Sequence, residues 1–142
     1  MGKARLYVTQ ATKISGQAYI LIGNNASLEL YAGHDVSIEG GGVINNPGYA
    51  KNFSLIGLND CQTVKIAGNA PYVGTINAPN AEVTFTGTSD VFGAVMAKSI
   101  KVRGNMNFHF DEALPAISRK GRYIPYAWEE LAPEDFAGLF KK

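Results

Sequence analysis

The residues with the widest choice of chemistry are His109, Asp111 and Glu112, which stand close together in the sequence. His109 and Asp111 are two positions apart, so in a strand both side chains point to one face and could form a histidine–carboxylate pair or part of a metal site. The same residues could instead close the last strand, with a carboxylate accepting backbone N–H groups of a following helical turn. The sequence favours this second role, because a metal site would need further ligands from distant parts of the chain.

The stretch from Gly41 to Asn52 predicts the most irregular surface of the protein. Its glycines are followed by Asn-Asn-Pro-Gly, and such a run is typical of an exposed loop. Gly41, Asn45, Asn46 and Tyr49 are therefore the candidate residues for contact with a partner.

Few other residues suggest chemistry. Cys61 and Ser99 have no base at a readable spacing, and Cys61 is expected to be a small buried apolar side chain. Tyr49, Tyr72 and Phe92 could contact a glycan, but the sequence favours packing in the core or at corners for them. We therefore predict no catalytic residue, no metal and no cofactor, and expect that the protein is not an enzyme.

Length and composition limit the class of protein. A chain of 142 residues fits a single domain, 1–142, and a hydrophobic content of 46% is enough for a folded core. The net charge of +1 argues against a nucleic-acid partner. Apolar runs fall short of the ~20 residues that cross a bilayer, so we expect no transmembrane segment in this chain. Abundant glycine with many β-branched and aromatic residues indicates an all-β fold.

A repeated pattern predicts the elements that must position these residues. Two apolar residues one position apart, closed by a glycine, occur at 64–68, 83–87 and 100–104. This alternation places the apolar side chains on one face of a strand. One series of glycines recurs at a nearly constant spacing: Gly23, Gly40, Gly57, Gly74 and Gly93. A second series runs beside it: Gly16, Gly33, Gly68, Gly87 and Gly104.

We therefore predict a short parallel β-helix, a solenoid of about five to six triangular coils of roughly 17 to 19 residues over 12–110. Glycines would form the corners, where the backbone has positive φ or lacks room for a Cβ. The two extra residues of the longer coil are expected to bulge at Pro79-Asn80. Composition changes after Phe110, and 111–142 are predicted to form a C-terminal cap or flank with a short helix.

Four short sequences carry a resemblance to a known family. They are Gly-Asn-Ala at 68–70, Ala-Pro-Asn-Ala at 78–81, Ala-Lys-Ser at 97–99 and His-Phe-Asp-Glu-Ala-Leu at 109–114. With them the chain resembles an uncharacterised bacterial β-helical domain of PilX-like, type IV pilus-associated surface proteins. The resemblance implies a right-handed β-helix held outside the cytoplasm, as a fragment of a longer anchored protein, and it supplies no catalytic residues. A chain complete as it stands would instead be cytoplasmic.

One function is preferred, and two alternatives stay open. The preferred function is a non-enzymatic structural or adhesive module of a bacterial cell-surface or pilus-associated protein, with a protein or glycan partner at the cell surface. The first alternative is a bactofilin-like β-helix scaffold that self-associates through its ends. The second is a glycan-binding or carbohydrate-active β-helix, although the sequence lacks the cluster of acids that such enzymes place on long loops.

Overall fold

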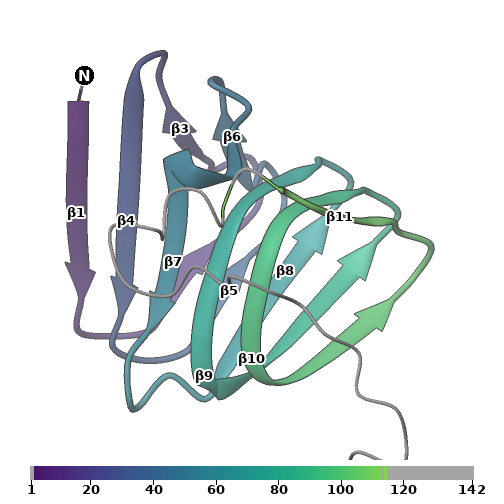
Figure 1. The fold of residues 1–142 in the computed structure, drawn as a ribbon. Helices are drawn as coiled ribbons and strands as arrows, with labels where there is room; N and C mark the ends of the chain where they lie inside the picture. Colours follow the sequence, from purple (N-terminus) through teal and green to yellow (C-terminus); the bar gives the residue numbers. More distant parts are fainter. Residues whose placement is uncertain (1, 113, 115–142) are drawn as a thin grey trace, which may run out of the picture.

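Eleven strands and one short 3-10 turn make up the described part of the chain. The computed structural model describes residues 2–112 and 114, and Figure 1 shows the strands winding from β1 at one end of the molecule to β11 at the other. The elements are β1 (Gly2–Val8), β2 (Thr12–Ile14), β3 (Ile20–Ile22), β4 (Ala26–Ala32), β5 (Val36–Ile38), β6 (Val43–Asn45), η1 (Ala50–Asn52), β7 (Phe53–Gly57), β8 (Thr63–Gly68), β9 (Tyr72–Gly87), β10 (Val91–Arg103) and β11 (Phe108–Phe110).

The strands stack in parallel as a β-solenoid of about five turns, which confirms the predicted all-β architecture. The first face consists of β1, β4, β7, the first halves of β9 and β10, and β11. The second face consists of β2, β5, β8 and the second halves of β9 and β10, which bend around a corner and so belong to both faces. The short pair β3 and β6 forms a third side.

Coil length varies along the chain instead of staying near the predicted period. The separation along the sequence between side chains that contact each other on neighbouring coils is 24 for Arg5 and Glu29 and rises to 26 for Glu39 and Lys65. It then falls to 21 for Ser54 and Thr75, 19 for Asn69 and Thr88, and 17 for Asp90 and Asn107. The predicted period is therefore right for the last two turns and wrong for the earlier ones. The early coils are longer because they include the third side, and the first of them begins at Gly2 rather than at Thr12.

A column of glycines forms the corner that follows the second face. All its members have positive φ: Gly16, Gly40, Gly68, Gly87 and Gly104. A Cβ added at Gly87 would lie 2.1 Å from the carbonyl oxygen of Gly68, and one added at Gly104 would lie 2.0 Å from that of Gly87. Glycine is needed here because a side chain would fit neither the backbone conformation nor the distance between coils.

The column corrects the predicted glycine series. Gly33 does not align with Gly16, because Gly40 occupies that place on the next coil. Gly23 and Gly57 also lie outside the column, since the early coils are longer than the spacing on which the prediction rested. Gly74 and Gly93 are paired as predicted, on the first face.

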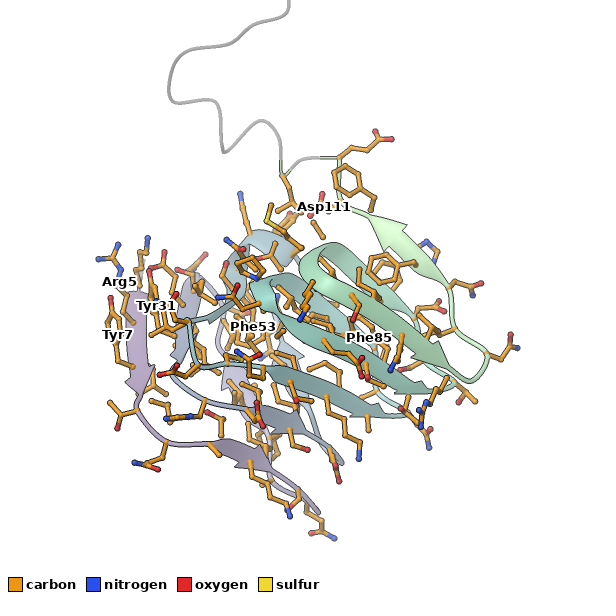
Figure 2. All side chains as sticks on the ribbon, turned by 90° about the horizontal axis from the view of Figure 1, so that it is seen from below. Arg5, Tyr7, Tyr31, Phe53, Phe85 and Asp111 are labelled. Atoms are coloured by element: carbon orange, nitrogen blue, oxygen red, sulfur yellow. The ribbon has the colours of Figure 1, made fainter. Side chains whose placement is uncertain are left out.

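The core follows the predicted alternation. Val83 and Phe85 point inward and are fully buried, and no charged side chain is buried within residues 2–112. Aromatic rings run through this core as a ladder of edge-to-face contacts, with Tyr72 between Phe53 and Phe85, and Phe108 beyond Phe85, at centroid distances of 5.8 to 6.2 Å. Figure 2 shows Phe53 and Phe85 within the coils. The solenoid is therefore held by apolar stacking between successive turns.

The predictions for two irregular regions differ in their outcome. The bulge predicted at Pro79-Asn80 is confirmed, because the register between β9 and β10 shifts after Ala78 and Ala97. The loop predicted from Gly41 to Asn52 is partly wrong, because it contains β6 and η1, with Val43 and Ala50 buried. Pairing of β6 with β3, on the previous coil, supplies the order that the local composition does not indicate.

The predicted C-terminal helix lies outside the described residues. Within residues 2–112 and 114, no helix has the length and apolar character needed to cross a membrane.

Candidate functional site

His109 lies on the outer side of the first face, where it contacts the coil before it. Its ring stacks on Phe92 with centroids 4.5 Å apart and planes within 10°, and Nε2 lies 3.5 Å from Oδ2 of Asp90. Phe92 and His109 are direct partners in the β10–β11 register. The position of His109 therefore joins two consecutive turns, and the carboxylate of Asp90 lies beside its ring.

Asp90 is a residue that the sequence analysis did not assign to this site. Its Oδ1 accepts hydrogen bonds from the side-chain amide of Asn107 at 3.0 Å and from the Asn107 backbone N–H at 3.3 Å. These hydrogen bonds, with a smaller contribution from the nearby His109, lower the pKa of Asp90 below its ordinary value. Asp90 and Asn107 are as far apart in the sequence as the paired residues of β10 and β11, so comparing residues one coil length apart could have identified this pair.

The same use of an aspartate occurs at a corner nearer the N-terminus. Oδ1 of Asp35 accepts the backbone N–H groups of Gln62 at 3.1 Å and of Thr63 at 2.8 Å, on the next coil. Asp35 and Asp90 thus both satisfy backbone donors where a coil turns a corner. This recurrence supports a structural role for the cluster around Asp90.

Asp111 and Glu112 follow the last described strand. The Asp111 backbone N–H donates to the carbonyl of Gly93 at 3.3 Å, and the Asp111 carbonyl accepts the N–H of Leu114 at 3.0 Å, so a turn begins here. Glu112 is exposed. In the described part of the chain, no three His, Cys, Asp or Glu side chains come together as a metal site would require.

The second candidate region, around Asn45 and Tyr49, is also tied into the solenoid. The Asn45 side-chain amide donates to the backbone carbonyls of Tyr49 at 2.9 Å and Val73 at 3.1 Å. The Asn46 N–H donates to the carbonyl of Ile22, and Gly41 packs closely against Tyr19. The Tyr49 ring is exposed, with the Lys51 ammonium 5.3 Å from its centroid. Of the four predicted contact residues, Asn46 and Tyr49 are exposed.

Tyr72 has the core position that the sequence favours for it, and it is not a glycan contact. Tyr72 is only 4% exposed, because the alternation of β9 directs it inward between Phe53 and Phe85. Burial raises the pKa of its hydroxyl. Phe92 remains partly exposed, but one face of its ring is covered by His109. A flat aromatic surface for a sugar ring is therefore smaller than the sequence predicts.

Cys61 is buried and free, as predicted for a small apolar side chain. Its Sγ lies within 3.1 Å of the place that a Cβ on Gly57 would take, and burial raises the pKa of its thiol. The thiolate that a nucleophile requires is therefore disfavoured.

Comparison with known proteins assigns a family. No curated protein and no solved structure matches the chain. Residues 1–117 match a family described as a domain of unknown function (DUF7305), and nothing in that description refers to a pilus. Because the match covers most of the sequence, the chain belongs to the DUF7305 family.

Proposed function

We propose that the protein is a non-enzymatic structural or adhesive module carried by a bacterial cell-surface or pilus-associated protein. One observation supports the structural part of this proposal: polar side chains at and beside the two candidate regions bind to neighbouring coils. His109 stacks on Phe92, Asp90 accepts from Asn107, and Asn45 donates to the backbone of Val73. These side chains stabilise the solenoid itself, as expected for a protein that serves as a spacer or platform.

Placement at the cell surface rests on the resemblance of the segment from Gly68 to Leu114 to PilX-like, pilus-associated domains. The same resemblance is the basis for a right-handed winding of the coils.

Surface labelling of intact bacteria tests the placement. An epitope-tagged copy expressed in the native host should react with antibody or be cut by added protease before lysis, while a cytosolic marker stays protected. Labelling that appears only after lysis would refute the surface assignment.

A self-associating scaffold is the second candidate, and the open edge of β1 favours it. Among the described strands, β1 pairs on one side only, with β4. An unpaired edge can add a strand from another chain. Filaments in negative-stain micrographs of the purified chain would favour the scaffold, whereas a species of fixed small size would exclude continuous polymerisation.

A further inference from the structure

The first coil exposes a sheet edge that has no partner in the described residues. Leu6 points inward like the buried Leu30 beside it on β4, yet it is 49% exposed, and no other described strand pairs with β1 on its second side. Tyr7 is 62% exposed and stacks one face of its ring on Tyr31, with centroids 4.4 Å apart. Among the described residues, no second ring stacks on Tyr7. Figure 2 shows Arg5, Tyr7 and Tyr31 together at this end of the molecule.

The backbone of β1 presents hydrogen-bonding groups at this edge. The Gly2 N–H donates to Asn25 and the Val8 carbonyl accepts from Gly33, so the even-numbered residues of β1 bond toward β4. Because peptide groups alternate along a strand, Lys3, Arg5 and Tyr7 direct their N–H and C=O groups to the open side. An added strand could therefore form hydrogen bonds with these residues.

We infer that two copies of the chain pair through β1, antiparallel and related by a two-fold axis at Leu6. In this register Arg5 lies opposite Tyr7 of the other copy, and each such pair exchanges both backbone hydrogen bonds. Leu6 lies opposite its own copy in a position without hydrogen bonds, where side chains are closest. The two half-exposed leucines then close the core of both solenoids.

Side-chain chemistry selects this register. A two-fold axis at Arg5 would place two guanidinium groups directly opposite each other, which is unfavourable. With the axis at Leu6, each Arg5 instead reaches the unstacked face of the other copy's Tyr7, a cation–π contact. Arg5 keeps its ion pair with Glu29, whose Oε2 lies 2.7 Å from Nε.

The far end of a second copy is a poorer occupant of this edge. β11 has three residues against the seven of β1. On the second face, stacking the last coil under the first would bring Lys101 and Arg103 of one copy toward Lys13 of the next. Pairing through β1 therefore gives a closed dimer, and it competes with the end-to-end scaffold because both use the same edge. This inference does not depend on the proposed surface role.

Cysteine cross-linking tests the dimer and its register. Leu6→Cys should form an intermolecular disulfide under mild oxidation, because Cα atoms of such a pair lie about 4.5 Å apart. Ala4→Cys should not, since it lies opposite Val8 and far from its own copy. The wild-type chain, whose Cys61 is buried, is the background control. Cross-linking of Arg5→Cys in place of Leu6→Cys would refute the register.

Sedimentation equilibrium tests the association itself. The wild type should show a monomer–dimer equilibrium, and Leu6→Asp should raise its dissociation constant at least tenfold. Val102→Asp is the matched control, because Val102 is also an inward-facing apolar residue that is about half exposed, at 51%, but it lies on the coil at the other end of the solenoid, beside the buried Phe85. Circular dichroism melts confirm that each variant is folded. A wild type that stays monomeric at high concentration, or a dimer that Leu6→Asp leaves intact, would overturn the inference.

Discussion

Replacing Gly87 by alanine tests the glycine column directly. The added Cβ would lie 2.1 Å from the carbonyl oxygen of Gly68, whereas ordinary contact begins at 3.4 Å. The two coils would have to separate locally by about 1 Å, which weakens the ladder hydrogen bonds on either side, each worth about 1 kcal/mol. Gly87 also has φ of +139°, a conformation that costs a non-glycine residue of order 1–3 kcal/mol.

Together these terms predict that Gly87→Ala lowers the free energy of unfolding by about 3–5 kcal/mol, a large share of the roughly 5–15 kcal/mol of an ordinary domain. Gly48→Ala provides the matched control. Gly48 also has positive φ, of +72°, but nothing lies within 4 Å of its would-be Cβ. Its cost should be that of the backbone conformation alone, about 1 kcal/mol.

Urea unfolding followed by circular dichroism measures both values under one condition. The reasoning requires the loss at Gly87 to exceed that at Gly48 by at least about 2 kcal/mol, the part assigned to the contact between coils. Equal losses would show that backbone conformation explains the glycine and that the coils can separate freely.

Three further perturbations separate inward from outward positions and charged from neutral groups. Phe85→Asp should abolish the cooperative thermal melt by placing a charge in the core. The adjacent Thr84→Asp, on the outer side of β9, should change the melting temperature by only a few degrees. Equal effects of the two substitutions would contradict the assignment of inward and outward faces. Lys3 and Arg5 lower the pKa of Glu29 from 4.5 to about 2, so Glu29 stabilises the fold above pH 4.5 and this contribution is lost as the pH falls toward 2. The Glu29→Gln variant should therefore lose less stability than the wild type between pH 5 and pH 2, as measured by urea titrations. An acid stability profile that the substitution leaves unchanged would contradict the ion pairing. Burial raises the pKa of Tyr72 above its ordinary value of 10, so the stability of the fold should decline as the pH rises above 10 and this tyrosine ionises in the unfolded chain. The Tyr72→Phe variant should show a smaller decline. An identical alkaline stability profile would contradict the burial of the hydroxyl.

Local patterns were enough to predict the regular part of the fold. Val83 and Phe85 alternate with polar residues and are buried as expected, and the pairing of Gly74 with Gly93 follows from their shared surroundings in the sequence. Both features depend on one strand and on the length of a single coil. The class of fold could therefore be predicted from composition and spacing.

The third side and the corner contacts could not be predicted in this way. Val43 lies among glycines and asparagines, and it is buried only because β6 pairs with β3 on the previous coil. Asp90 and Asn107 are ordinary exposed residue types until the coil length brings them into contact. Such contacts depend on which coil lies above which, and that follows from coil lengths that vary between turns.

The narrowing of the solenoid determines where the sequence can change its length. Long coils at the N-terminal end stack with shorter coils toward the C-terminal end, and the first face nevertheless continues through every turn. The difference is taken up at the third side, formed by β3 and β6 and absent from the later described coils. Insertions and deletions on that side leave the long faces in register. Related domains can therefore differ in this flank while keeping the same stacked frame, whereas a single residue added within a strand of the last coil would shift its inward side chains to the outside.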